Sequence, residues 1–338
     1  MAEQSAEASG LAVPAHTVPA PASVSPQARA FLSQRMDPGG IVQPVGSHDK
    51  DAWRAYIAES NHWLTLGMAA SAEAFPAEVI THQLEHTEMY ELVPTNLDPD
   101  LAGGAIFYLH GGAYIHGGGM AGAYMAMPLA SHARMRTFVV DYRMPPDHPF
   151  PAGLDDAVEG YRAALERFAA GNIAVAGGSA GGGLAGALVL KVRDLGLPMP
   201  GACVLATPEN DLTESGDSFE TNIHVDVVLT QRLTDSIALY ADGHDLTDPY
   251  LSPLFGDFTK GFPPTFLNCG TRDAFLSNTV RMHRALIKAG IHAELQVWEG
   301  MPHGGFFGAP EDQEVLAEQA AFIRRTIAQA DRPSRTGA

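Results

Sequence analysis

A short apolar run that ends in a glycine-rich turn decides the fold of this chain: residues 173–182 read IAVAGGSAGG. Ile173 to Ala176 has the length and β-branched content of a buried strand, and Gly182 to Val192 has the character of a helix. Between them, Gly177 to Gly181 matches G-x-S-x-G, in which a serine stands on a tight turn from strand to helix. Glycines suit this turn because a Cβ would clash with the adjacent strand and helix. The pattern predicts Ser179 as a nucleophile whose hydroxyl projects above a sheet.

Strand-like runs and helix-like segments alternate along the chain from about residue 79. Helical spacing of apolar residues appears in Leu154 to Phe168 and again in Leu316 to Ile327. This alternation predicts an α/β fold with a mainly parallel sheet that is covered on both faces. The first two strand-like runs have no helix between them, so we expect them to form an antiparallel hairpin at one edge. The eight expected strands are Val79 to Leu84, Met89 to Val93, Ala105 to Leu109, Thr137 to Tyr142, Ile173 to Ala176, Ala202 to Ala206, Thr265 to Cys269 and Ala293 to Trp298.

The regular alternation defines a catalytic domain over residues 79–330. Residues 1–25 are rich in Ala, Pro and Ser and lack the apolar core of a signal peptide, so we expect a disordered N-terminal arm and a cytoplasmic protein. Residues 26–78 carry helix-like segments, and residues 208–262 form a long insertion before the seventh strand. Because open α/β sheets bind ligands at the carboxyl ends of their strands, we expect the first segment and part of the second to form a cap. The alternative is that both are peripheral decoration.

The composition is that of a globular, acidic protein. The 338 residues are 46% hydrophobic, and 21 Lys and Arg stand against 39 Asp and Glu, which gives a formal net charge of −18. This charge would repel phosphate backbones and anionic lipids, so neither nucleic acid nor a membrane is an expected partner. Apolar runs are too short for a membrane-spanning helix. The two cysteines, Cys203 and Cys269, lie in strand-like runs and are expected to be buried free thiols.

A second glycine-rich motif, His110-Gly111-Gly112-Ala113, directly follows the strand-like run that ends at Leu109. Small residues at this place allow main-chain N–H groups to approach a substrate carbonyl closely. We expect His110, with Gly111, to hold this loop through main-chain hydrogen bonds and not to act as a base. The predicted oxyanion hole consists of three N–H groups, those of Gly112, Ala113 and Ala180.

A hydrolytic serine needs a base and an orienting acid, and on this kind of fold both follow the serine, the acid first. Asp273 follows the seventh expected strand by four residues, and His303 follows the eighth by five. Both are therefore expected at the sheet edge that carries Ser179. Asp211, after the sixth strand, is the alternative acid. No metal-binding or nucleotide-binding spacing is present, so neither a metal nor another cofactor is expected.

Together these motifs resemble the bacterial hormone-sensitive-lipase-like esterases, also called HGGG esterases, of the α/β-hydrolase superfamily. The resemblance covers most of residues 80–330 and also rests on Asp141-Tyr142-Arg143, on Pro146 to Ala152 and on Asp248 to Leu254. It implies an eight-stranded sheet, a helical cap and cofactor-independent hydrolysis of esters, usually with short acyl chains. It supports the same catalytic residues, namely Ser179, Asp273 and His303.

The chain departs from the pattern of this group at three places. Ala113 replaces the third glycine of the oxyanion loop, and Gly178 stands where the group often has Asp. The pair Gly304-Gly305 adds a residue after His303, in the loop that must aim the imidazole. These departures concern the geometry of the site, and hence its rate.

The expected function is hydrolysis of small, short-acyl carboxylic esters through a Ser-His-Asp triad and an acyl-enzyme. The alternatives are lactone or amide hydrolysis by the same triad, or an inactive ligand-binding protein on the same scaffold. A small ester is the expected partner, and a homodimer through the last strand, Ala293 to Trp298, is left open. Three aromatic residues are candidates for the substrate pocket, although each suits core packing equally well: Tyr114, Trp63 and Phe306.

Overall fold

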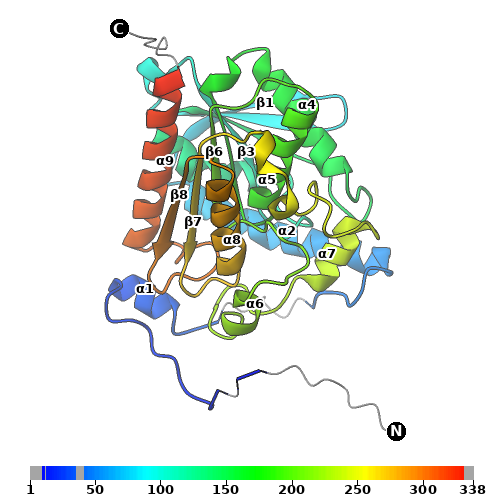
Figure 1. Cartoon of the computed structure of the whole chain (residues 1–338), viewed down its shortest axis with the longest axis vertical. Helices are drawn as coiled ribbons and strands as arrows, with labels where there is room; N and C mark the ends of the chain where they lie inside the picture. The colour runs from blue at the N-terminus through cyan, green and yellow to red at the C-terminus, as the bar shows by residue number, and fades with distance from the viewer. Residues whose placement is uncertain (1–9, 12, 36–41, 331–338) are drawn as a thin grey trace.

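A single sheet forms the centre of the protein, seen in a computed structural model that describes residues 10, 11, 13–35 and 42–330. The sheet has eight strands in the order β1-β2-β4-β3-β5-β6-β7-β8 (Figure 1). The predicted α/β fold is thereby confirmed. The strands are β1 (Ala77–Gln83), β2 (Glu88–Pro94), β3 (Ala105–Leu109), β4 (Arg136–Val140), β5 (Ile173–Gly178), β6 (Ala202–Ala206), β7 (Thr265–Gly270) and β8 (Ala293–Trp298).

The first two strands form the antiparallel edge that the sequence predicts. β1 pairs antiparallel with β2, and β2 pairs antiparallel with β4. All the pairs from β4 to β8 are parallel. Parallel strands place their carboxyl ends at one edge of the sheet, so the loops after β3, β5, β6, β7 and β8 share that edge. β8 is the other edge strand, and a homodimer through it stays a prediction.

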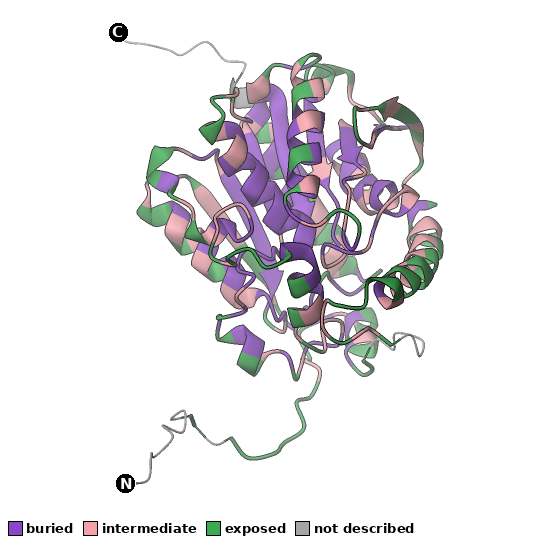
Figure 2. Ribbon diagram, turned by 90° about the vertical axis from the view of Figure 1, so that its right-hand side faces the viewer, coloured by how far each residue is buried: buried purple, intermediate pink, exposed green. Residues whose placement is uncertain are grey.

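Helices cover both faces of the sheet. α3 (Met120–Ala133) and α9 (Pro310–Ala330) pack on the face that presents Ile106 and Phe266. On the opposite face, α4 (Ala152–Leu165), α5 (Ala180–Asp194) and α8 (Leu276–Lys288) pack against Phe107, Val175 and Leu267. The central strands are therefore buried on both sides, whereas the outer faces of the helices are exposed (Figure 2). This explains why the central strands read as continuous apolar runs.

The N-terminal region and the insertion contribute further helices. The first provides α1 (Pro26–Phe31) and α2 (Lys50–Ala72), and the second provides α6 (Ser218–Thr221) and α7 (Thr234–Ala241). The buried Trp53 of α2 packs against Ile115, in the loop after β3, and Leu239 of α7. α2 and α7 thus meet beside the predicted oxyanion loop, while a cap over the site stays a prediction. Four short 3₁₀ helices complete the described elements, at Pro99–Leu101, Ala170–Asn172, Pro253–Phe255 and Phe258–Lys260.

The N-terminal arm is described only in part. Residues 1–9 and 12 of the arm lie outside the described residues. Further along, Pro19 accepts a hydrogen bond from Arg272, and Ser25 donates to Glu311 through both its main chain and its hydroxyl. Pro19 and Ser25 of the arm therefore contact the catalytic domain.

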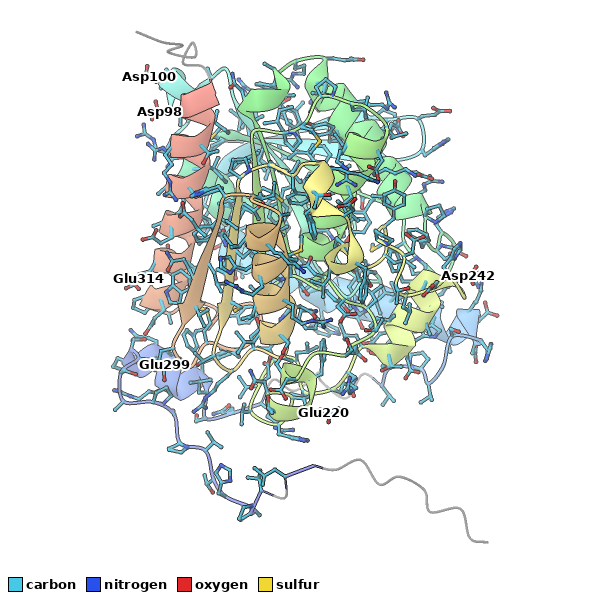
Figure 3. The ribbon with its side chains drawn as sticks, in the orientation of Figure 1. Asp98, Asp100, Glu220, Asp242, Glu299 and Glu314 are labelled. Carbon is cyan, nitrogen blue, oxygen red and sulfur yellow. The ribbon has the colours of Figure 1, made fainter. Side chains whose placement is uncertain are left out.

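The surface carries the acidic side chains that the composition implies. Six of them, labelled in Figure 3, extend from different elements around the outline of the molecule: Asp98, Asp100, Glu220, Asp242, Glu299 and Glu314. Inside, Cys203 and Cys269 are both free and buried, as expected, and burial raises the pKa of each thiol. No helix within the described ranges is long and apolar enough to cross a membrane.

Candidate active site

Ser179 stands on the turn between β5 and α5. Its backbone angles are φ 56° and ψ −127°, a conformation that is costly for any residue with a side chain. Flanking glycines make the turn possible: a Cβ on Gly177 would lie 2.2 Å from the carbonyl oxygen of Gly181, and one on Gly181 would lie 2.1 Å from that of Leu109. At Gly178 the nearest heavy atom would be 3.7 Å away, so this position is not sterically restricted to glycine. The turn leaves Ser179 partly exposed at the amino end of α5.

The three predicted catalytic side chains meet in one hydrogen-bonded row. Ser179 Oγ lies 2.9 Å from His303 Nε2, and His303 Nδ1 lies 3.0 Å from Asp273 Oδ1. Both His303 and Asp273 are buried, and the ring of Phe275 packs edge-on against the imidazole with centroids 4.6 Å apart. This is the arrangement in which a histidine can take the proton of a serine while a carboxylate holds the ring.

Asp273 has further partners that hold its carboxylate in place. The main-chain N–H of Phe275 donates to Oδ1 at 2.8 Å, and the hydroxyl of Thr207 donates to Oδ2. Thr207 also lies 2.9 Å from His303 Nδ1. Sequence reasoning did not predict Thr207, although its place directly after β6, at the same edge as the triad, was a usable signal.

The alternative acid, Asp211, has its own partners. It forms an ion pair with Arg281 at 2.5 Å and accepts hydrogen bonds from Thr213 and Ser215. Asp273 is therefore the carboxylate that contacts the imidazole of His303, whereas the carboxylate of Asp211 is paired with Arg281.

The surroundings of His303 change its basicity. Burial lowers the pKa of the imidazole, but the charge of Asp273, its hydrogen bond and the charge of Asp226 together raise the pKa above its ordinary value. A stronger base accepts the serine proton more readily, at the cost of being protonated over a wider pH range. The two acidic residues beside His303 thus set the pH range over which the site can be active.

The loop after β3 lies directly on the serine turn. A Cβ on Gly111 would lie 2.9 Å from the carbonyl oxygen of Gly178 and 3.2 Å from Ser179 Cβ. Gly112 and Ala113 follow with φ of 124° and 53°. Across the described residues, the N–H groups of these two make no hydrogen bond, so both are available to a ligand. Ala113 bears its methyl group in the left-handed region, which costs about 1 kcal/mol.

His110 is packed into the base of this loop. Its ring stacks on Tyr142 with centroids 4.1 Å apart, and its Nδ1 lies 2.9 Å from the carbonyl oxygen of Gly111. Burial lowers the pKa of His110, so the ring is neutral. A neutral, enclosed imidazole that contacts its own main chain is consistent with the predicted supporting role of His110, which stays a prediction.

The chain is similar to known proteins in sequence and in fold. Residues 106–307 match the family model described as the alpha/beta hydrolase fold. An acetyl-hydrolase of Streptomyces hygroscopicus is 32% identical over 254 residues, which are 74% of this chain and 83% of that protein. The chain belongs to the α/β-hydrolase family, in its hormone-sensitive-lipase-like group of esterases. A crystal structure of an esterase from the bacterial hormone-sensitive lipase family matches this hydrolase with a TM-score of 0.75 and 26% identity, over 90% of this chain and 99% of the other.

A second solved structure extends the likeness beyond the family motifs. The esterase E25 superposes on the hydrolase with a TM-score of 0.86 and 35% identity, over 94% of this chain and 99% of that one. A match over 94% of the chain leaves too few residues unmatched to omit the whole of the insertion. The likeness to this solved esterase therefore extends beyond the sheet.

The three predicted pocket aromatics of the hydrolase are not brought together. Trp63 lies on α2 with 60% of its surface exposed. Tyr114 is buried, stacked on Tyr240 at 4.2 Å. Phe306 is buried in another cluster, with its ring edge-on to Phe31 of α1. Their contribution to a substrate pocket stays a prediction.

Glu209 is a further feature of the site that sequence reasoning did not predict. Its main-chain N–H donates to the carbonyl oxygen of Ser179 at 3.0 Å, and its carboxyl group is fully buried with no hydrogen-bond partner among the described residues. Burial raises its pKa well above the ordinary value, which favours the neutral acid over the carboxylate. Its position three residues after the end of β6 places it at the edge of the sheet that carries the triad.

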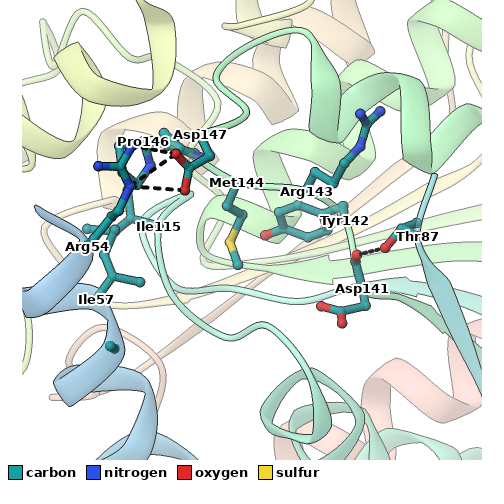
Figure 4. Close-up of a pocket in the computed structure, with 12 residues that line it drawn as sticks. Arg54, Ile57, Thr87, Ile115, Asp141, Tyr142, Arg143, Met144, Pro146 and Asp147 are labelled. Atoms are coloured by element: carbon teal, nitrogen blue, oxygen red, sulfur yellow. Dashed lines mark hydrogen bonds and ion pairs between the residues drawn. The ribbon is translucent and has the colours of Figure 1, made fainter. Parts of the chain in front are cut away.

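A separate cleft of about 420 Å³ lies between α2 and residues 141–147 of the hydrolase. Figure 4 shows Arg54 of α2 paired with Asp147 across it, at 2.7 Å, while Asp141 and Met144 lie further along. Neither Ser179 nor its two partners line this cleft. It is therefore distinct from the triad.

Proposed function

We propose that the chain hydrolyses small, short-acyl carboxylic esters with Ser179 as nucleophile, His303 as base and Asp273 as the orienting acid. Ester hydrolysis is the activity that its relatives have in common by name. The single observation that supports the assignment of residues is the unbroken row from Ser179 Oγ through both ring nitrogens of His303 to Asp273.

The first half of the reaction forms an acyl-enzyme. As Ser179 Oγ bonds to the ester carbonyl carbon, its proton moves to Nε2 of His303, and the carbonyl π electrons move to the oxygen. The N–H groups of Gly112, Ala113 and Ala180 stabilise this oxyanion, and the loss of one such donor typically costs about 10²- to 10³-fold in turnover. The carbon–oxygen bond to the alcohol then breaks, and His303 gives its proton to the leaving oxygen.

The second half repeats the sequence with water. His303 takes a proton from the water as the water oxygen attacks the acyl carbon, and the same N–H groups hold the second oxyanion. The bond to Ser179 Oγ breaks, Oγ regains a proton from His303, and the carboxylic acid leaves. No cofactor takes part in this proposed sequence.

The test of the proposal removes the nucleophile alone. Ser179→Ala should abolish hydrolysis of p-nitrophenyl acetate and labelling by a fluorophosphonate probe, because no other hydroxyl in the described part of the chain is paired with His303 Nε2. Thermal unfolding should stay close to that of the wild type. Ser71→Ala, which removes an exposed hydroxyl on α2, is the matched control. Wild-type turnover in Ser179→Ala would disprove the assignment.

The size of the acyl group is the finer part of the proposal. A relative named acetyl-hydrolase supports a short acyl chain. Rates over acyl lengths from about two to twelve carbons, with lactones and amides added, should be greatest for the short esters. A maximum at long chains would contradict this preference, and faster turnover of lactones would favour the alternative activity of the same triad.

A further inference from the structure

Asp226 occupies a central place between the catalytic loops. It lies in the insertion, between α6 and α7, and its carboxyl group is fully buried. Oδ1 accepts hydrogen bonds from the N–H groups of Val228 at 2.9 Å and Leu229 at 3.1 Å. Oδ2 accepts from the N–H of Ala274 at 3.0 Å, and the N–H of His303 lies 3.3 and 3.2 Å from the two oxygens. One carboxylate therefore joins the insertion, the acid loop and the histidine loop.

Burial of the Asp226 carboxylate carries a free-energy cost, because the charged group loses its water. Burial raises the pKa of Asp226, and the nearby charge of Asp273 raises it further, while the charge of His303 and the hydrogen bonds from Ala274 and Val228 lower it. Main-chain N–H donors are what a buried carboxylate needs in order to replace its lost water. The four donors around Asp226 come from three separate loops, so the carboxylate is satisfied only when the loops are assembled.

The two carboxylates near His303 hold different parts of the same residue. Asp273 binds the imidazole, and Asp226 binds the main chain of His303 and of Ala274, the residue after Asp273. The chain then continues through Gly304 and Gly305 at φ 76° and 108°, where glycines leave the backbone unusually free. The added glycine of this loop thus lies directly beside the main-chain contact with Asp226.

We propose that Asp226 is a positioning residue that fixes the main chain of His303 and so aligns the imidazole between Ser179 and Asp273. The proposal rests on the proposed function, because it concerns the same triad. It also gives the insertion a part in the reaction that does not depend on contact with the substrate. Asp226 acts through His303 and touches no reacting atom.

The test is Asp226→Asn, which keeps the size of the side chain. Either orientation of the amide turns an NH₂ group toward N–H donors, so the contact with His303 is lost or weakened. We expect kcat to fall about 10- to 100-fold, as expected for a misplaced catalytic group, with KM nearly unchanged. Glu220→Gln is the control, since it removes an exposed carboxylate of the same insertion, which pairs with the surface residue Arg232.

The pH profile separates a positioning role from a merely structural one. The charged groups that face His303 are Asp273 from the acid loop and Asp226 from the insertion. Loss of the Asp226 charge should move the acid limb of kcat to lower pH. Asp226→Glu keeps the charge on a longer side chain, so it should keep the wild-type midpoint while kcat falls. If Asp226→Asn does not fold, the kcat and the pH midpoint of Asp226→Glu still test the positioning role.

Each outcome decides the proposal. A wild-type kcat and an unmoved midpoint in Asp226→Asn would overturn it, and so would an equal loss in Glu220→Gln. Failure of both Asp226 variants to fold would assign the residue to the fold as a whole, which also overturns the proposal. Wild type and Ser179→Ala are measured alongside, and activity that does not depend on Ser179 would contradict the proposed function itself.

Discussion

The turn that carries Ser179 and the loop that carries His303 are held in opposite ways. The serine turn is fixed by Gly177 and Gly181, which approach the main chain of α5 and β3 so closely that no side chain fits. The histidine loop is fixed by distant residues: Asp226 of the insertion, Asp312 of α9 and the cluster around Phe31 of α1. The first depends on local backbone geometry, and the second depends on the assembled fold.

The largest expected effect breaks the serine turn. In Gly181→Ala the new Cβ would lie 2.1 Å from the carbonyl oxygen of Leu109 and 2.4 Å from that of His110, and neither main chain can move aside cheaply. We expect a loss of more than about 3 kcal/mol in the free energy of unfolding, with little active protein. Gly178→Ala is the control, because its nearest neighbour would be 3.7 Å away, and it should unfold like the wild type. Denaturant titration measures both, and equal stability of the two variants would contradict this account.

A comparable loss of stability, but a smaller loss of activity, is expected where the histidine loop meets the N-terminal segment. Phe306 is 3% exposed and packs with Val24 and Leu32, so Phe306→Ala should cost about 3–5 kcal/mol in unfolding free energy and reduce kcat as His303 loses support. Its neighbour Phe307 is 51% exposed, and Phe307→Ala should cost less than about 1 kcal/mol. Urea unfolding with a parallel kcat measurement tests the pair. The support from α1 would be refuted if both changes had the same effect.

The smallest expected effect concerns the pH at which the activity of the wild type is half-maximal. Only neutral His303 can accept the serine proton, and its pKa is raised above the ordinary value of 6.5. Activity should therefore fall as pH decreases, with its midpoint above 6.5. Burial lowers the pKa of His110, and that of His116 to about 4, so neither contributes to this limb. A profile of kcat/KM against pH with a midpoint below 6.5 would show that burial outweighs the two carboxylates at His303.

The same contrast explains which parts of the molecule could be predicted from the sequence. β3 and β6 have the predicted bounds because a buried strand is recognised from its own apolar residues, and the edge strand β8 has its predicted bounds as well. β4 ends at Val140, two residues before the predicted end, next to Asp141, whose carbonyl oxygen accepts a hydrogen bond from the hydroxyl of Thr87. The limits of the remaining strands differ from the predicted ones by one or two residues, so the sequence pattern locates each strand but not always its ends.

The residues of the site also differ in how far the sequence predicts them. Ser179, Asp273 and His303 were predicted because each stands at a fixed place relative to a strand end. Thr207 and Asp226 stand out in the folded molecule, where the hydroxyl of Thr207 meets Asp273 and the carboxylate of Asp226 meets the main-chain N–H of His303. Whether Trp63 lines a pocket stays a prediction, since an aromatic residue on a helix does not reveal from the sequence which side of the helix faces solvent.

The enclosed cysteines have a practical consequence. Cys203 and Cys269 are 0% and 1% exposed, and a thiol with a raised pKa offers almost no thiolate to a maleimide at neutral pH. A single fluorescent dye can thus be attached to one introduced cysteine, because the two native thiols react hardly at all. A reporter placed by Glu220→Cys, on the exposed side of α6, would follow motion of the insertion during turnover without prior removal of a native cysteine.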